Sequence, residues 1–195
     1  MKIVVGISGA SGAPYARRLL QHLRACSDKP EVSLVLSRSA QEVYRLECAA
    51  DPAEFGLPIY SGRDYSAPFA SGSSAADAMV IVPASMSSVA RIAHGISDDL
   101  LTRAADVMLK ERRRLILVPR ETPYSTIHLE NLLRLSQAGA LVMPASPSFY
   151  GQPRSIDEVL DTVLCRILDH LGIANHLTKR WQGELERPLD HGEHL

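Results

Sequence analysis

Short runs of apolar residues recur along the chain and alternate with longer segments in which apolar residues return every three or four positions. The short runs are too brief and too rich in β-branched residues for helices, so they predict buried strands. The longer segments predict amphipathic helices. This alternation indicates an α/β fold, a three-layer Rossmann- or flavodoxin-like parallel sheet with helices on both faces. The predicted strands cover residues 2–8, 32–36, 78–82, 115–118 and 140–143.

Helices are predicted after each of these strands. Pro14 suits the first turn of the first helix, and Ser125 and Ser155 are predicted N-caps of later ones. These helices are expected at about 14–25, 88–94, 100–111 and 156–171, and two more are expected after Ser37 and after Ser125. The helix after Ser125 is predicted to bury one apolar face, formed by Ile127, Leu129, Leu132, Leu133 and Leu135.

Residues 51–75 interrupt the α/β pattern. They contain three prolines and end in the small-residue run 70–75. Loops this long without secondary structure are uncommon in compact domains and are usually functional or disordered. We expect a mobile flap and not a domain linker, because the α/β pattern resumes directly after it.

Length and composition predict one soluble, cytoplasmic domain at residues 1–180, followed by a polar tail at 181–195 that contains Trp181. The formal net charge of −1 gives no electrostatic reason to expect nucleic acid or a membrane surface. No basic-then-apolar leader precedes the first strand, and no apolar run approaches membrane-spanning length. Cys26, Cys48 and Cys165 are far apart, which favours buried thiols in a reducing compartment.

Small or hydroxyl-bearing residues follow several predicted strands, at the edge where α/β sheets bind ligands. Such residues let backbone amides approach a phosphate, and helix N-termini add a favourable dipole. The first turn lacks the third glycine of the dinucleotide fingerprint, and no phosphate-loop lysine is present. Three such turns on successive strands favour a mononucleotide, a flavin in particular. The candidate binding residues are Gly9, Ala10, Ser11, Ser37, Ser85, Met86, Ser87, Ser88 and Arg120.

Arg120 and Glu121 stand side by side after the strand that ends at Pro119. A cation beside a carboxylate at this edge indicates anion binding next to proton transfer. A surface ion pair that caps the strand fits the same residues about equally well. Both interpretations stay open on the sequence alone.

Three further residues complete a candidate site for a phosphorylated small molecule near the flavin. Lys110 ends a predicted helix, where the dipole also favours a plain C-terminal cation. Tyr150 lies in a loop framed by proline and glycine. Arg166 follows Cys165 inside an apolar helix, and a buried arginine requires an anionic partner. The seven histidines show no metal-binding spacing, and the serines lack a nucleophile elbow.

Five stretches of the chain carry a family resemblance: Gly6–Gly12, Leu101–Val107, Leu117–Pro123, Ile127–Asn131 and Pro144–Tyr150. Together they resemble the flavin prenyltransferase (UbiX) family, over nearly the whole chain up to about Trp181. The Pro-Arg-Glu-x-Pro block with His-Leu-Glu-Asn is specific, whereas Gly-Ala-Ser-Gly is shared with the wider flavin-dependent cysteine decarboxylase superfamily.

This resemblance implies a flavodoxin-like subunit that assembles into a homododecamer with active sites at subunit interfaces. The implied reaction joins the dimethylallyl group of dimethylallyl phosphate to N5 and C6 of reduced FMN, without a metal. The product, prenylated FMN, serves a UbiD-type decarboxylase, and the pathway and the preference for monophosphate or diphosphate stay open.

The resemblance also implies roles for individual residues. The turn residues named above, with Arg120, would bind FMN. Tyr150 and Arg166 would hold the prenyl phosphate, with Lys110 and Arg103 supplied near the interface. Glu121 would be the acid–base residue that protonates the departing phosphate. The chain departs from the family pattern at Ser87-Ser88 and at Asp98-Asp99, where an extra carboxylate would disfavour a nearby anion.

Two other functions remain possible on this evidence. One is an FMN-dependent decarboxylase acting on a peptidyl- or pantothenoyl-cysteine, which would need a histidine base in the first half of the chain. The nearest candidates, His22 and His94, are not convincingly placed for that role. The other is a non-catalytic FMN-binding accessory subunit of an aromatic-acid decarboxylase.

Overall fold

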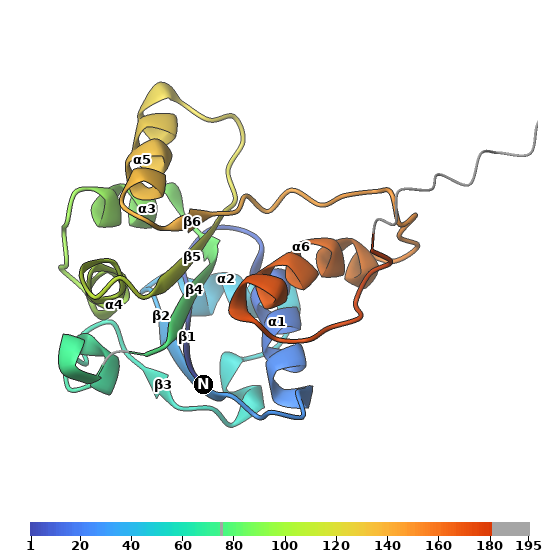
Figure 1. The fold of residues 1–195 in the computed structure, drawn as a ribbon, viewed down its shortest axis with the longest axis horizontal. Helices are drawn as coiled ribbons and strands as arrows, with labels where there is room; N and C mark the ends of the chain where they lie inside the picture. The colour runs from blue at the N-terminus through green and yellow to red at the C-terminus, as the bar shows by residue number, and fades with distance from the viewer. Residues whose placement is uncertain (75, 181–195) are drawn as a thin grey trace, which may run out of the picture.

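The computed structural model describes residues 1–74 and 76–180, and its centre is a six-stranded sheet (Figure 1). Every neighbouring pair of strands is parallel, and the order is β3-β2-β1-β4-β5-β6. The predicted parallel α/β architecture is therefore confirmed. The polar tail predicted at 181–195, with Trp181, lies outside the described residues. The strands are β1 Lys2–Ile7, β2 Glu31–Leu36, β3 Ile59–Tyr60, β4 Ala78–Ala84, β5 Arg114–Pro119 and β6 Leu141–Val142.

Helices cover both faces of this sheet, which makes three layers (Figure 1). One hydrophobic core joins the sheet to α1, α2 and α6, and a second joins it to α3, α4 and α5. Within the described ranges, no helix combines the length and the apolar character needed to cross a bilayer. The helices are α1 Ala13–Ala25, α2 Ala40–Cys48, α3 Met86–Ala93, α4 Leu100–Lys110, α5 Thr126–Gln137 and α6 Ile156–Leu171.

Burial on both faces explains why the strands appear as continuous apolar runs. In β1, Ile3, Val5 and Ile7 point into the core under α1 and α6, while Val4 points into the core under α4. Parallel sheets covered on both faces need apolar residues at successive positions. Each such fully buried side chain contributes about 1.5–3 kcal/mol, so local pattern and tertiary burial agree here.

The strand order reverses between β1 and β4, because β2 lies on one side of β1 and β4 on the other. In open α/β sheets, ligands bind beyond the carboxyl ends of the strands at such a reversal. The residues that follow β1 and β4 therefore meet at the expected ligand edge. These are the turns at 8–12 and 85–88.

The predicted structureless flap at 51–75 is wrong for the residues described, 51–74. Its chain forms short 3₁₀ helices at Pro52–Phe55, Pro68–Ala70 and Gly72–Ser74, and it supplies the edge strand β3. The Asp51 carboxylate caps the first of these turns, accepting a 2.9 Å bond from the Ala53 amide. The rings of Tyr60 and Phe69 pack edge to face at 5.1 Å. Contacts of this kind join residues at irregular separations in the sequence, so no periodic pattern of apolar residues predicts them.

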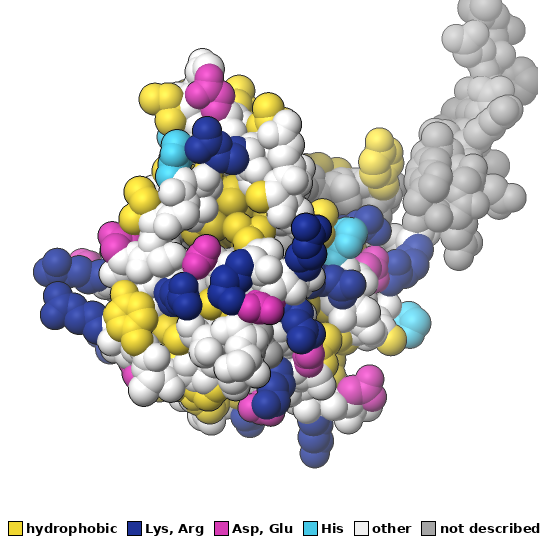
Figure 2. All heavy atoms as spheres, turned by 60° about the vertical axis from the view of Figure 1, so that its left-hand side comes forward, with side chains coloured by type: hydrophobic (Ala, Val, Ile, Leu, Met, Phe, Trp, Pro, Cys, Tyr) yellow, Lys and Arg dark blue, Asp and Glu magenta, His cyan; other side chains and the backbone are white. Residues whose placement is uncertain are grey.

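The apolar face predicted for α5 is only partly buried. Leu132 and Leu135 enter the core, whereas Ile127, Leu129 and Leu133 are between 54% and 68% exposed. The helix packs against α3 and β6 at the end of the sheet, so only one side of it is covered. Figure 2 shows hydrophobic side chains gathered on the surface over this helix. Apolar residues on one side of α5 are thus left for another contact.

A buried carboxylate fastens α6 to α1. Asp161 of α6 is 4% exposed and receives both arms of the Arg18 guanidinium, at 2.9 and 2.7 Å. His22 lies 3.3 Å from the same carboxylate. A bidentate pair of this kind sets both position and orientation, so α6 is held at a defined place on the α1 face.

Candidate functional site

Ser8 joins the two turns at the ligand edge. Its hydroxyl donates to the Pro83 carbonyl at 2.7 Å and accepts from the Ser85 amide at 2.6 Å. The Ser8 side chain is buried, with the residue 1% exposed. One hydroxyl therefore holds the end of β1 at a set distance from the start of α3.

The turn after β1 presents free backbone donors. Within the described residues, the amides of Gly9, Ala10 and Ser11 have no hydrogen-bond partner. They precede α1, where Gly12 adopts a φ of 118°, a left-handed conformation that glycine accepts readily. A Cβ added at Gly9 would overlap the Ser39 hydroxyl. Successive free amides before a helix form a cradle for an anion or a polar ring edge.

Glu47 of α2 reaches the beginning of α1, a contact that the sequence analysis missed. Its Oε2 atom accepts bonds of 2.8 Å from both the Gly12 and the Ala13 amides. Burial pushes the pKa of Glu47 upward, but hydrogen bonds from Ser11 and these amides, with the nearby Arg120 charge, leave it below its usual value. Glu47 is ionised at neutral pH and places a negative charge within the site.

The turn after β4 places a group of hydroxyls at the N-terminus of α3. Ser85 is the N-cap, and its Oγ lies within 3.3 Å of the Ser88 amide and within hydrogen-bond distance of the Ser87 and Ser88 hydroxyls. Met86 and Ser88 are buried, whereas Ser87 is exposed. Of these four predicted contacts, Ser85 and Ser87 are the ones that the fold leaves open to a ligand.

Ser37 follows β2 beside the end of β1, with its amide bonded to the Ile7 carbonyl at 2.9 Å. Its hydroxyl oxygen is buried and has no hydrogen-bond partner within the described chain. A buried hydroxyl without a partner costs free energy unless a ligand satisfies it. Together with the free amides after β1, Ser37 fits a bound mononucleotide at this edge.

Arg120 and Glu121 do not pair with each other. The Arg120 Nε donates to the Ser11 carbonyl at 2.8 Å, which directs the guanidinium across the turn after β1. Glu121 accepts instead from the Thr122 amide at 3.0 Å. Burial of Tyr124 raises the pKa of its hydroxyl, and the nearby negative charge of Glu121 raises this pKa further. The surface ion pair considered for Arg120 and Glu121 is therefore wrong, and both groups face the ligand edge with donors and acceptors to spare.

Lys110 lies at the opposite edge of the sheet from Glu121 in the same chain. It ends α4 and pairs with Glu111, just before β5 begins. At about 3.3 Å per residue, the six residues of β5 separate the two ends by roughly 20 Å. Arg103, on the same helix, donates to the Ala70 carbonyl and to Asp106, each at 3.1 Å. Within one chain, Lys110 therefore lies far from Glu121, and the partners of Arg103 among the described residues are Ala70 and Asp106.

Arg166 is not buried, which corrects the sequence-based expectation. Its side chain is 60% exposed and its partner among the described residues is Asp169, at 3.3 Å. The buried stripe of α6 contains Val163, Leu164 and Ile167, and position 166 falls on the opposite side of the helix. Tyr150 is 81% exposed in the loop after β6. Both groups point outward from the chain that carries them.

The two acidic residues Asp98 and Asp99 share one arginine, so half of their negative charge is neutralised. Arg91 donates to each of their carboxylates at 2.8 Å. Asp99 is also the N-cap of α4, where it and Thr102 form a capping box. The expected repulsion of a nearby anion is thus reduced, because these charges already have a partner.

The histidines considered as catalytic bases have structural partners. His22 contacts Asp161, and His94 lies 3.1 Å from both the Asn131 amide oxygen and the Arg134 guanidinium. His128 completes a capping box with Ser125 at the start of α5. Within the described part of the chain, no group of three His, Cys, Asp or Glu side chains could hold a metal ion.

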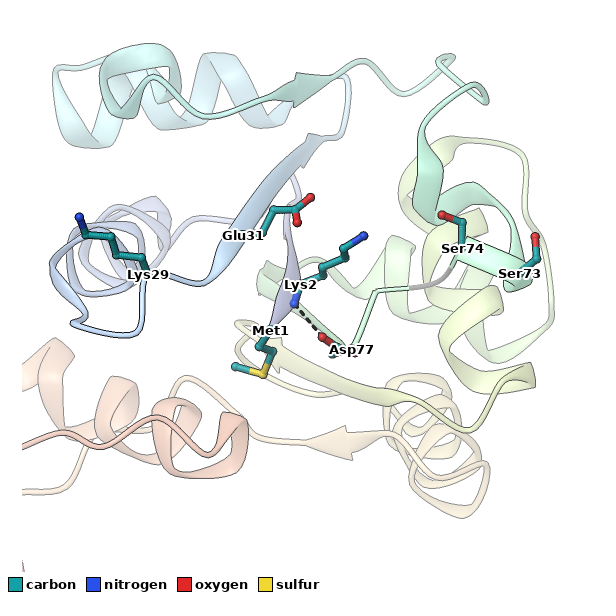
Figure 3. Close-up of a pocket in the computed structure, with 7 residues that line it drawn as sticks. All are labelled: Met1, Lys2, Lys29, Glu31, Ser73, Ser74 and Asp77. Atoms are coloured by element: carbon teal, nitrogen blue, oxygen red, sulfur yellow. Dashed lines mark hydrogen bonds between the residues drawn. The ribbon is translucent and has the colours of Figure 1, made fainter.

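An open hollow lies at the amino ends of the strands, away from the ligand edge (Figure 3). The Asp77 carboxylate at its rim accepts a 2.8 Å bond from the Lys2 amide and faces Arg113 at 3.9 Å. All of its lining residues are exposed, and the turns described above contribute none of them. The lining residues are Met1, Lys2, Lys29, Glu31, Ser73, Ser74 and Asp77.

Replacing Ser8 by alanine is expected to lower the free energy of unfolding by about 1–3 kcal/mol, because the Ser85 amide loses its buried acceptor. FMN affinity should fall as well, since the two turns lose their cross-link. Chemical denaturation and fluorescence titration with FMN measure the two effects. Ser33→Ala in β2 is the matched control, and equal behaviour of the two variants would argue against a positioning role for Ser8.

A family model described as Flavoprotein matches residues 1–168. The flavin prenyltransferase UbiX of Thermoplasma acidophilum is 51% identical over 185 residues, which cover 93% of this chain and 100% of the relative.

Two solved structures match with a TM-score of 0.90 each. One, 41% identical, is AnUbiX (PadA1) in complex with FMN and dimethylallyl pyrophosphate, and the match covers 94% of this chain and 98% of that one. The other, 42% identical, is a dodecameric FMN-dependent UbiX-like decarboxylase from Escherichia coli O157:H7, and the match covers 94% of this chain and 100% of that one. The family match at residues 1–168 includes the turns after β1, β4 and β5.

Proposed function

The chain belongs to the flavin prenyltransferase family, and we propose that it transfers the dimethylallyl group of dimethylallyl phosphate to N5 and C6 of reduced FMN. The observation that carries the proposal is the pairing of a mononucleotide cradle with an unpaired carboxylate. The free amides at 9–11 and the Ser37 hydroxyl form the cradle, and Glu121 directly follows Arg120, whose guanidinium donates to the Ser11 carbonyl in the first of these turns. The relative crystallised with FMN and dimethylallyl pyrophosphate supports this assignment.

FMN would be held by the turns after β1, β2 and β4 and by Arg120. Gly9, Ala10 and Ser11 offer amides, Ser37 and Ser87 offer hydroxyls, and the Ser11 carbonyl orients Arg120. Reduced FMN, when bound there, supplies the electron-rich positions to which the prenyl group is joined. Hydrogen bonds from these amides require the backbone to come close to the ligand. Gly9 allows this approach because it has no side chain.

Glu121 would act as the acid–base residue. A phosphate that leaves an allylic carbon carries developing negative charge, which cations stabilise and a proton donor neutralises. Glu121 has no cation partner within 4 Å among the described residues, so its carboxyl is available to exchange a proton. Arg120, one residue earlier, supplies a fixed positive charge at the same edge.

The prenyl-phosphate residues would come from neighbouring copies of the chain. Lys110 lies roughly 20 Å from Glu121 along β5, and Tyr150 and Arg166 point outward. A site shared between copies accounts for the positions of all three residues. In such a site, each copy places these side chains beside the FMN bound by another copy. The dodecameric relative and the exposed apolar side of α5 support such an assembly, which we propose is a homododecamer.

We further propose that prenylated FMN passes to a UbiD-type decarboxylase and that the protein works in the cytoplasm. Cys26, Cys48 and Cys165 are free thiols, which supports a reducing compartment. The alternative of a cysteine decarboxylase has less support, because His22 and His94 are held by structural partners.

The test is an anaerobic reaction of the purified protein with reduced FMN and dimethylallyl phosphate, followed by mass spectrometry of the extracted flavin. We expect a flavin heavier by one prenyl unit. Omission of the prenyl phosphate is the control. Unmodified FMN, in a reaction where a known prenyltransferase is active, would contradict the proposal and favour the decarboxylase or accessory alternatives.

A further inference from the structure

One carboxylate at the end of α6 faces two guanidinium groups. Arg180 donates to both oxygens of Asp169, at 2.9 and 2.7 Å. Arg166 reaches one of these oxygens at 3.3 Å, and the Asn175 amide donates to the other at 3.0 Å. The cluster therefore carries one excess positive charge, and Arg180 holds the carboxylate more closely than Arg166 does.

The segment that carries Arg180 is anchored along α6. The Asn175 side chain also donates to the Cys165 carbonyl at 3.3 Å, and the Thr178 hydroxyl donates to the Cys165 sulfur at 3.3 Å. Ile173 and Leu177 pack against the core under α6. These contacts bring Arg180 to Asp169 from 11 residues further along the chain.

Pairing with Asp169 limits what Arg166 can do for an anion. A carboxylate beside a guanidinium competes with a phosphate for the same N–H donors and repels its charge. The two-oxygen contact with Arg180 leaves Arg166 only a single, longer bond to Asp169. The hydrogen bonds from Arg180 also keep the pKa of Asp169 low, so the carboxylate stays charged and stays with Arg180. Among the described residues, the remaining N–H donors of Arg166 have no partner, and its side chain is exposed.

We propose that Arg180 is a positioning residue that occupies Asp169 and thereby makes Arg166 available to the phosphate of the prenyl donor. This inference rests on the proposed function, which assigns Arg166 to that phosphate. Without Arg180, Asp169 turns to Arg166 and captures the group that the donor needs. Arg180 itself need not touch the substrate.

The test is calorimetric titration of dimethylallyl phosphate into protein loaded with oxidised FMN, which binds without turnover. We expect Arg180→Ala to weaken binding about fivefold, the size of an exposed charge effect. The double variant Arg180→Ala/Asp169→Asn should bind like wild type, because a neutral amide no longer captures Arg166. Arg166→Ala should stay weak whether or not Asp169 is neutralised.

Melting temperatures and FMN affinities of the same variants distinguish a positioning role of Arg180 from a contact that only stabilises the fold. If the contact between Arg180 and Asp169 only stabilises the fold, the single and the double variant should both melt at a lower temperature, and the double variant should not recover prenyl-phosphate binding. That result, or an Arg180→Ala variant that binds like wild type, overturns the inference. A wild-type protein that binds no dimethylallyl phosphate would overturn the proposed function itself.

Discussion

Replacing Glu121 by glutamine is expected to slow prenyl transfer by two to four orders of magnitude, the usual contribution of a positioned proton donor. The substitution keeps the size and one hydrogen-bond acceptor of the side chain, including the contact with the Thr122 amide. It removes the proton that the departing phosphate needs. FMN binding should be unchanged, because the substitution does not alter the amides at 9–11 or the Ser37 hydroxyl, the groups proposed to hold FMN.

The measurement compares single-turnover rates under anaerobic conditions, with flavin absorbance as the check on occupancy. Glu31→Gln is a matched control, because Glu31 is an exposed carboxylate at the amino ends of the strands (Figure 3). It should react at the wild-type rate. A Glu121→Gln variant that keeps full turnover with FMN bound would remove Glu121 from the acid–base role.

Co-expression of Lys110→Ala and Glu121→Gln chains is expected to restore activity that neither variant has alone. Loss of Lys110 should cost about a hundredfold, as for removal of one group that stabilises transition-state charge. If Lys110 and Glu121 of one site come from different copies, random mixing at equal ratio leaves about one site in four intact. The separation of roughly 20 Å along β5 is the physical reason for this expectation.

A second mixture controls for this effect. Arg120 and Glu121 are adjacent in one chain, so co-expression of Arg120→Ala with Glu121→Gln should restore nothing. Distinct affinity tags on the two chains verify that mixed assemblies form, and light scattering checks that their mass is many times the 21.3 kDa of the chain. Mixed assemblies of the first pair without recovered activity would place Lys110 and Glu121 in the same subunit's site, or Lys110 outside it.

Several errors of the sequence analysis share one cause. Arg166 was expected to be buried because its neighbours in sequence are apolar, yet the helix turns it away from the stripe at 163, 164 and 167. Ile127, Leu129 and Leu133 were expected in the core of this chain, yet α5 has only one covered side. In both cases the local pattern identified a helix correctly but not what lies beside it.

Glu47 shows what a sequence pattern cannot contain. It lies 34 and 35 residues from the amides that it binds, on a different helix. No spacing rule connects a carboxylate in α2 with the start of α1, because that contact exists only once both helices pack on the sheet. The same holds for Ser8, which bridges to residues 75 and 77 positions later.

The sequence by itself determined the parallel α/β fold, five of the six strands, the helix caps at Ser125 and Ser155, and the edge of the sheet at which the turns rich in small and hydroxyl-bearing residues meet. These depend on short-range periodicity and on turn chemistry, which neighbouring residues express directly. The tertiary structure decided that Arg120 contacts Ser11 and not Glu121, that Glu47 binds the amides at the start of α1, and that Lys110 lies at the far edge of the sheet. Such facts depend on distances between segments that are remote in sequence, and these distances follow from packing.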